Sequence, residues 1–389
     1  MYNSISHILI LDYHSWHRNI TRQISHPNMT TYQQQINRLL ELDVRFLLYA
    51  RHRSGYADRI LHFISTYLVA LLTHRYFVFD QNWPAFLKVM KSNLNYEYNL
   101  VIPWYSQLNK LTRKTRNQLS VQYQWFSLER FTKDYDYENK NRILVFGGHT
   151  GTTVHTITSP TSIYRSFLTN TLKMTGDTLF GCLYHSLIIP RLSTFVQIAS
   201  AQSSSQFKGG QTHQQLLQTL LSTTHNSVAI QIRTGDEIMK NPHRMYSLMY
   251  KFQIYFDCAK EISQGKPTIV YLMADDYRIR QAALKTYSNT QFSVIANPHP
   301  VQHIQYTQNL VQALNSLLFD TFLFMFCERH IITSESGFGR FAAFASLKQK
   351  DIYSFDVGEV KTWRCEEKDN RALSLTEAGH RWSGVRRKR

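Results

Sequence analysis

The sequence predicts an α/β protein built on parallel, doubly wound sheets. Short apolar segments typical of buried strands alternate with longer segments of helical periodicity. One such segment, Val228 to Ile232, ends in the polar turn Arg233-Thr-Gly-Asp236, as strands of open α/β sheets do at their ligand edge. The chain has 389 residues, more than a single hydrophobic core usually serves, so we expect two domains.

Composition limits the class of partner. The hydrophobic fraction of 43% and the aromatic fraction of 13% exclude a disordered chain. The formal net charge of +17 indicates an anionic partner, namely nucleic acid, a membrane surface or a phosphate-bearing small molecule. The one dense basic run is the tail Arg386 to Arg389, and no zinc knuckle, basic zipper or RNA-recognition motif accompanies it. We therefore expect no nucleic-acid partner.

The four cysteines are scattered and include no CxxC pair, which argues against a metal site and a disulfide scaffold. Three of them, Cys182, Cys258 and Cys327, lie among apolar neighbours and are predicted to be buried thiols. The run Ile8 to Leu11 is too short for a signal peptide or a spanning helix. We expect a soluble chain that meets a membrane only through an anchor upstream of Met1. The sequons that begin at Asn19 and Asn28 matter only in a secretory compartment.

The N-terminal half predicts a βαβ unit after a surface arm. Residues 1–44 are assigned to the arm, which leads into a helix around 34–42. A strand at 46–50 is followed by a cation-rich turn with Gly55, a helix at 60–73 and a strand at 76–79. A further strand at 142–146 runs into the glycine-rich turn 147–151, which lacks the Lys-Ser/Thr of a P-loop.

The C-terminal half continues the alternation of strands and helices. We place the passage between domains near the polar loop 203–211, which gives domains at 45–210 and 211–360 and a basic tail at 361–389. The predicted strands are 227–232, 268–273, 291–296 and 329–333, and the predicted helices are 245–263, 277–288, 308–326 and 340–347.

Three strand ends in this half carry polar residues. After the first, Arg233 offers a planar guanidinium fork to a diphosphate, or forms an Arg-Asp pair that ties off the strand. After the second, Asp275 and Asp276 accept hydrogen bonds from a nucleoside, or one of them caps the next helix. After the third, the turn Ser334 to Gly339 presents helix N-terminal N–H groups to an anion, or is a tight turn without a ligand.

These motifs, taken in order, resemble the fucosyltransferase superfamily, and within it the plant xyloglucan fucosyltransferases. The resemblance rests on the turn, helix and strand from Ser54 to Asp80, on the Phe-x-x-Leu-x-x-x-Leu-x-x-Pro segment from Phe180, on Gln231-x-Arg233, and on the Ser-x-Ser-x-Phe-Gly motif from Ser334. The chain departs from the family pattern at Ala57, at Asp58 and at Thr234. These residues stand where the family has a glycine, an asparagine and, in many members, a second arginine.

The resemblance implies two Rossmann-like domains that face each other across a cleft, the GT-B type, with the acceptor domain first and the GDP-sugar domain second. It implies an inverting transfer of fucose from GDP-fucose to a hydroxyl of a glycan acceptor, with no metal and no cofactor. Arg233 would hold the β-phosphate and neutralise the charge that develops on it. The implied donor-binding residues are Gln231, Arg233, Thr234, Asp236, Asp275, Asp276, Ser334, Ser336, Gly337, Phe338 and Gly339, and the implied acceptor-side turn is Gly55, Asp58 and Arg59.

The general base is less defined. The carboxylate that the plant enzymes carry downstream of the strand at 142–146 has no counterpart here, so Asp58, His149 and His155 are the candidates. A second hypothesis, favoured by Ala57, Asp58 and Thr234, is a catalytically inactive GDP-sugar-binding or glycan-binding protein of the same fold. The resemblance implies a Golgi location; the alternative is the cytoplasm, because no signal or transmembrane segment is recognised.

Overall fold

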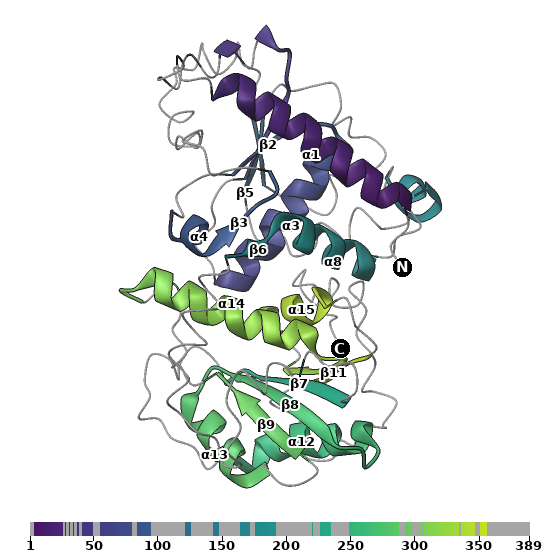
Figure 1. Cartoon of the computed structure of the whole chain (residues 1–389), viewed down its shortest axis with the longest axis vertical. Helices are drawn as coiled ribbons and strands as arrows, with labels where there is room; N and C mark the ends of the chain where they lie inside the picture. Colours follow the sequence, from purple (N-terminus) through teal and green to yellow (C-terminus); the bar gives the residue numbers. More distant parts are fainter. Residues whose placement is uncertain are drawn as a thin grey trace. The chain divides into compact units, whose positions relative to one another are not determined.

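The structure is a computed structural model with two parallel sheets, which confirms the predicted α/β class. The residues it describes are 4–25, 28, 31, 34, 37–38, 41–49, 55–79, 84–94, 121–125, 143–147, 164–171, 176–191, 220, 226–234, 249–287, 292–297, 304, 307–333, 336–346 and 351–355. The chain divides into two compact units, residues 1–189 with 379–389, and residues 190–378 (Figure 1). The predicted boundary at 210 lies outside the described residues.

The first unit is built on a four-stranded parallel sheet of order β2-β1-β5-β4. Its strands are β1 (Phe46–Tyr49), β2 (Tyr76–Phe79), β4 (Val121–Trp125) and β5 (Ile143–Gly147). Helix α3 (Tyr56–Leu72) connects β1 to β2 and completes the predicted βαβ unit. It begins four residues before the predicted start at 60, because the turn residues Ala57 to Arg59 are already helical.

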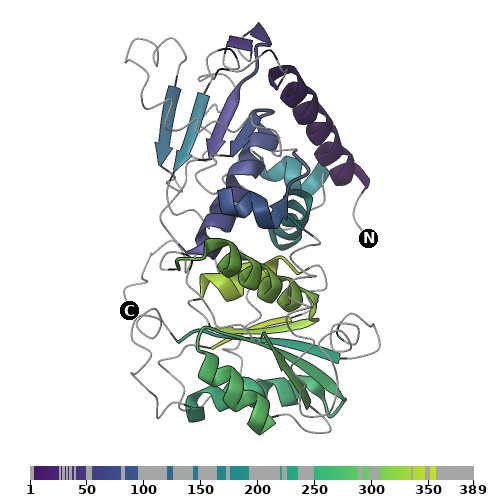
Figure 2. The ribbon, with the colours of Figure 1, turned by 60° about the vertical axis from the view of Figure 1, so that its left-hand side comes forward.

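Residues 4–24 do not form a surface arm, as the sequence suggested, but helix α1 (Ser4–Ile24), which packs against the first unit (Figures 1 and 2). Its buried face is partly polar. The Tyr13 hydroxyl donates to the Arg75 carbonyl at 2.6 Å, and His17 Nε2 lies 2.9 Å from the Phe77 carbonyl. The arm prediction was wrong because the docking face of α1 includes buried histidine and tyrosine side chains, which do not give the apolar pattern of a docked helix.

The remaining elements of the first unit include the segment that begins at Phe180. They are helix α4 (Pro84–Val89), strand β3 (Met90–Lys91), a π-helix (Phe167–Thr171), helix α8 (Gly176–Leu187) and strand β6 (Ile189–Pro190), which pairs with β3. Phe180, Leu183 and Leu187 are all buried. Three of the four residues that define this motif therefore fill core positions of α8.

The second unit has a five-stranded parallel sheet of order β11-β10-β7-β8-β9. Its strands are β7 (Asn226–Ile232), β8 (Thr268–Ala274), β9 (Phe292–Ala296), β10 (Arg329–Thr333) and β11 (Asp351–Phe355). The chain runs outward from β7 through β8 to β9 and then returns to β10 on the other side of β7. The order therefore reverses between β7 and β10, and this switch point is where open α/β sheets bind ligands.

Helices cover both faces of this sheet, as a buried parallel sheet requires. They are α12 (Met249–Ser263), α13 (Tyr277–Tyr287), α14 (Leu310–Phe326) and α15 (Gly337–Phe344). Figures 1 and 2 show α12 and α13 on one face and α14 and α15 on the other. The Phe256 and Tyr287 rings stack at 3.9 Å and join the two helices of the first pair. Helix α15 begins at Gly337, three residues before the predicted start at 340.

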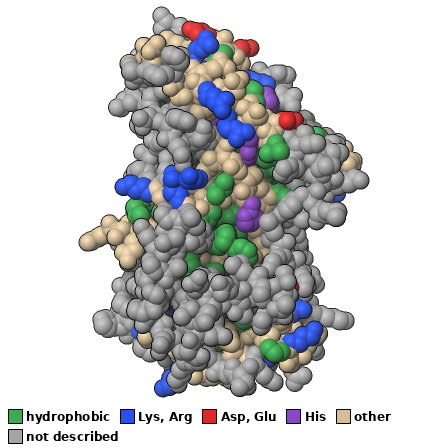
Figure 3. Space-filling view, viewed as in Figure 1, with side chains coloured by type: hydrophobic (Ala, Val, Ile, Leu, Met, Phe, Trp, Pro, Cys, Tyr) green, Lys and Arg blue, Asp and Glu red, His purple; other side chains and the backbone are tan. Residues whose placement is uncertain are grey.

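Two further expectations meet the structure here. Cys327 is a buried free thiol and Cys182 a partly buried one, but Cys258 is disulfide-bonded, so its prediction as a thiol was wrong. Within the described part of the chain, no helix has the length and apolar character needed to cross a membrane. Lys and Arg side chains occur in several separate places on the face shown in Figure 3, in keeping with a positive charge that is spread along the sequence.

Candidate functional site

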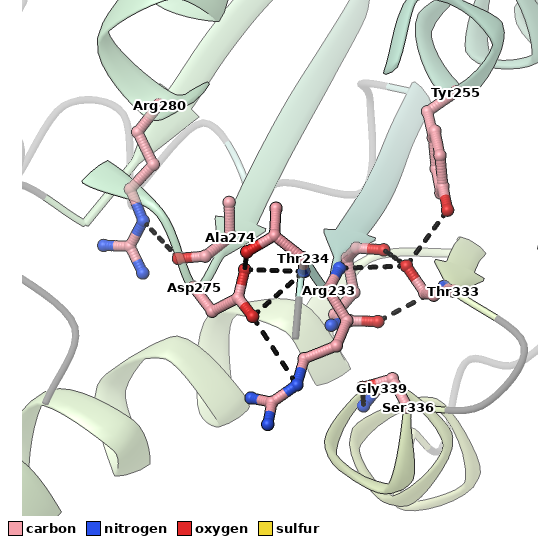
Figure 4. A network of polar contacts seen from close by, with 10 residues as sticks. Arg233, Thr234, Tyr255, Ala274, Asp275, Arg280, Thr333, Ser336 and Gly339 are labelled. Carbon is pink, nitrogen blue, oxygen red and sulfur yellow. Dashed lines mark hydrogen bonds and ion pairs between the residues drawn. The ribbon is translucent and has the colours of Figure 1, made fainter. Parts of the chain in front are cut away.

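The candidate site lies at the carboxyl ends of β7, β8 and β10, at the switch point of the second sheet (Figure 4). Arg233 and Thr234 follow β7, Asp275 follows β8, and Ser336 caps the helix that follows β10. Parallel strands end at the same edge of a sheet, and this is why residues so distant in sequence meet. The structure thus brings together residues from all three predicted strand ends.

An ion pair joins the first two strand ends. Arg233 Nε lies 3.5 Å from Asp275 Oδ2, and the side chains are 30% and 6% exposed, respectively. The backbone N–H of Thr234 donates to both Asp275 oxygens at 2.9 and 3.0 Å, and its hydroxyl donates to Oδ1 at 2.7 Å. The partner of Arg233 is thus an aspartate at a different strand end, which the sequence reading of the turn 233–236 did not propose, and the pair leaves almost a third of the arginine side chain open to solvent.

Thr333, the last residue of β10, connects β7 to the third strand end. Its hydroxyl accepts a hydrogen bond from the Arg233 N–H at 2.9 Å and lies 3.0 Å from the Tyr255 hydroxyl. Its own N–H donates to Gln231 Oε1 at 3.3 Å. The sequence analysis missed Thr333 and Tyr255. The position of Thr333 at the end of a predicted strand was a usable signal, whereas nothing in the sequence marked Tyr255.

Helix α15 begins close above β7. Ser336 is its N-cap, and its hydroxyl accepts a hydrogen bond from the Gly339 N–H at 3.2 Å. A Cβ atom on Gly339 would lie 2.5 Å from Gln231 Oε1, so a larger residue here requires the Gln231 side chain to shift. The positive end of the helix dipole and the backbone N–H groups of Gly337 and Phe338 lie at the same end of α15. With the Arg233 guanidinium at the same sheet edge, this arrangement suits a phosphate anion.

Asp276 makes different contacts from its neighbour Asp275. One carboxylate oxygen accepts from the Arg278 backbone N–H at 2.9 Å, and the other lies 2.6 Å from a terminal nitrogen of the same arginine. Asp276 therefore caps the first turn of α13, as the alternative reading of the sequence proposed. A nucleoside contact for Asp276 stays a prediction.

A buried network of hydrogen bonds and one ion pair lies next to the carboxyl end of β8. Arg280, 1% exposed, donates to the Ala274 carbonyl at 2.9 Å and to the Asn297 carbonyl at 2.7 Å, and it pairs with Asp320 at 3.2 Å. The Tyr271 hydroxyl donates to Asp320 at 2.6 Å. Burial, followed by the charge of Asp320, raises the pKa of Tyr271 well above its usual value, so the tyrosine remains a donor. The ends of β8 and β9 are thereby tied to α13 and α14.

The residues predicted for the acceptor-side turn belong to the first unit. Gly55 is the N-cap of α3, while Asp58 and Arg59 lie in its first turn rather than in the turn that the sequence suggested. Asp58 is half-buried at the end of the helix where the dipole favours negative charge. Arg59 is buried, and its carbonyl accepts a hydrogen bond from the Tyr49 hydroxyl at 3.2 Å.

Four predicted site residues, His149, His155, Asp236 and Ser334, lie outside the described residues. Over the part of the chain that is described, no group of three or more metal-ligating side chains comes together.

Comparison with known proteins shows similarity at the level of structure. No protein-family model matches the sequence, and no curated protein sequence matches it. An arginine-to-lysine mutant of FUT1 from Arabidopsis thaliana, solved in complex with GDP, aligns with a TM-score of 0.59 and 14% identity over 91% of this chain and 79% of that chain. The fucosyltransferase NodZ from Bradyrhizobium aligns with a TM-score of 0.46 and 15% identity, over 80% of this chain and 96% of its own. The chain therefore shares the fold of the FUT1 structure, in agreement with the fold that its resemblance to fucosyltransferases implies.

Proposed function

We propose that this protein is a fucosyltransferase that uses GDP-fucose as donor and a hydroxyl of a glycan as acceptor. The observation that carries the proposal is the fixed Arg233 guanidinium beside the N-terminus of α15, at the switch point of a parallel sheet. The fold is shared with a plant FUT1 structure that binds GDP, and the sequence motifs at the three strand ends fit the same donor.

The chemistry follows from charge. As the bond between fucose and the diphosphate breaks, negative charge builds up on the β-phosphate, and preorganised donors at that position lower the barrier. Arg233 supplies a cation and α15 supplies backbone N–H groups, so the proposed reaction needs no metal. Inversion requires a base for the acceptor hydroxyl, and Asp58, His149 and His155 remain the candidates.

The first experiment measures thermal unfolding of the whole chain with GDP, GDP-fucose, UDP and ADP. We expect stabilisation by the two guanine nucleotides only. Hydrolysis of GDP-fucose, or its transfer to a panel of glycans, is then measured with and without EDTA, and we expect equal rates. Stabilisation by UDP or ADP alone would overturn the donor assignment.

The variant Arg233→Ala is expected to weaken the response to GDP and to remove the turnover. Arg329→Ala is a matched control, because Arg329 lies at the opposite end of β10 and bonds Asn226 and the Ile262 carbonyl. Its loss removes two side-chain hydrogen bonds without touching the switch point. Undiminished turnover in Arg233→Ala would refute the proposal.

The second candidate function is a GDP-sugar-binding protein without turnover. Thr234 favours it, because a threonine whose N–H and hydroxyl are both bound to Asp275 supplies no second cation to the diphosphate. Stabilisation by GDP together with absent turnover on a broad acceptor panel is the outcome that selects this candidate.

We propose a Golgi-type secretory location. Disulfides persist mainly in oxidising compartments, and Cys258 is disulfide-bonded. The sequon residues Asn19 and Asn28 are both exposed. After expression in eukaryotic cells, a mass decrease on treatment with a glycosidase specific for N-glycans is expected. A fully reduced chain without glycan would support the cytoplasmic alternative.

A further inference from the structure

We propose that Asp275 is a positioning residue, which orients Arg233 toward the diphosphate and makes no direct contact with the nucleoside. This inference rests on the proposed function of the site and deepens it. It assigns to Asp275 a role different from the nucleoside contact that its sequence position suggests.

The acceptor capacity of the Asp275 carboxylate is already in use. A carboxylate has about four lone-pair sites on its two oxygens. Oδ1 receives the Thr234 N–H at 2.9 Å and the Thr234 hydroxyl at 2.7 Å. Oδ2 receives the Thr234 N–H at 3.0 Å and faces Arg233 Nε at 3.5 Å. Three donor groups therefore already face the two oxygens, and a guanine base or a ribose hydroxyl would compete with them.

Exposure separates the two members of the ion pair. The Asp275 side chain is 6% exposed, whereas that of Arg233 is 30% exposed. A ligand that arrives from solvent therefore meets the guanidinium first. In Figure 4 the Nε of Arg233 faces the carboxylate, and the two terminal nitrogens point away from it. Those nitrogens form the fork that binds phosphate oxygens in a bidentate manner.

The arginine is held at two points. Its backbone N–H is fixed by the Thr333 hydroxyl at 2.9 Å, and its side chain is fixed at Nε by Asp275. A long side chain that is ordered before binding loses less conformational entropy when the ligand arrives. Thr234 takes part in this arrangement, because one short residue supplies two of the donors that hold the carboxylate in place.

The test compares GDP with GMP, which carries the base, ribose and α-phosphate but lacks the β-phosphate. In Asp275→Asn the volume is kept, but the charge that holds Nε is lost. We expect calorimetric affinity for GDP to fall about tenfold and affinity for GMP to change less than about twofold. The kcat for GDP-fucose should fall more than its KM rises, since charge on the β-phosphate increases from the bound donor to the transition state. An equal loss for GDP and GMP would overturn the proposal and make Asp275 a nucleoside ligand.

A second variant tests the same role in case Asp275→Asn fails to fold. Thr234→Val keeps the carboxylate and removes one of its donors, and we expect the same selective loss for GDP, on the order of threefold. In the background of Arg233→Ala, Asp275→Asn should weaken GDP binding no further, because a positioning residue has nothing left to position. Additive losses would contradict the inference.

Asp320→Asn serves as the matched control. Asp320 is a buried carboxylate that pairs with an arginine of the same unit, Arg280 at 3.2 Å, but it belongs to the buried network next to the carboxyl end of β8. We expect lower thermal stability with an unchanged ratio of GDP to GMP affinity. If the wild-type chain binds no GDP, the proposed function fails and this inference fails with it, whereas GDP binding with equal losses in Asp275→Asn overturns the positioning role alone.

Discussion

Replacing Gly339 by alanine tests whether the close approach of α15 to β7 is as tight as its geometry indicates. The new Cβ would lie 2.5 Å from Gln231 Oε1 and 3.0 Å from Cδ, so the buried Gln231 side chain has to move. Movement breaks its hydrogen bond from the Thr333 N–H, which is 3.3 Å long. Because Thr333 also binds the Arg233 N–H, the disturbance extends to the site itself.

The expected magnitude combines three terms. Overpacking of a buried position costs about 1–3 kcal/mol, and loss of a hydrogen bond costs about 1 kcal/mol. Alanine recovers up to about 1 kcal/mol relative to glycine within a helix. The free energy of unfolding of Gly339→Ala should therefore fall by about 1–3 kcal/mol, which lowers the melting temperature by roughly 2–12 °C in a domain of this size.

Urea denaturation and thermal unfolding measure this loss, and calorimetry with GDP measures its effect on the site. The control is the same substitution in a Gln231→Ala background, where the clash is absent and Gly339→Ala should be neutral or stabilising. A gain in stability of Gly339→Ala in the wild-type background would refute the reasoning, because it would show an ordinary helix position with room for a methyl group.

Three further predictions concern stability and the state of the cysteines. Burial lowers the pKa of His14 to about 4 and the pKa of His17 to about 3, from the ordinary histidine value of about 6.5. Below pH 6.5 these two histidines therefore bind more protons in the unfolded chain than in the folded chain. The stability of the first unit should therefore be fully present above about pH 6.5 and fall as pH decreases toward 4, and His17→Gln should flatten this dependence in denaturation curves. Tyr271→Phe removes a donor from a buried, charged acceptor, and unfolding should become easier by about 1.5–3 kcal/mol, with no change in the GDP-to-GMP affinity ratio. Since Cys258 is disulfide-bonded, thiol titration of the unfolded, unreduced chain should detect two thiols, and titration of the reduced chain should detect all four. Four thiols in both titrations would show that the chain contains no disulfide.

Hydrophobic periodicity was sufficient to predict most strands and helices of the second unit. The apolar runs that end at Ile232 and Thr333 are strands that end at those residues, because strands buried on both faces are read directly from continuous hydrophobic character. The start of α15 was misplaced by three residues. Glycines at 337 and 339 looked like turn residues, whereas in the structure both belong to the first helical turn and Gly339 lies close to Gln231.

The first unit was harder to predict for a physical reason. Helix α1 docks through His14, His17 and Tyr13, which are polar in sequence but are buried neutral and hydrogen-bonded in the fold. The partners lie more than fifty residues away, at Tyr67, Arg75 and Phe77, so no local pattern reveals them. Contacts within the site share this property: the sequence marked Arg233 and Asp275 as polar strand ends but did not show that they pair.

The link between Arg233 and Thr333 spans one hundred residues of chain. Loops of that length close slowly, and parallel sheets of high contact order fold late in comparison with local structure. The sheet edge that holds the guanidinium forms only when β10 has paired with β7. Strand β10 follows β8 and β9 in the chain, so this pairing comes after both of them have been synthesised. Under the proposed function, affinity for a phosphate-bearing nucleotide should therefore appear with the last cooperative step of the second unit, and such a nucleotide would report that this unit has folded.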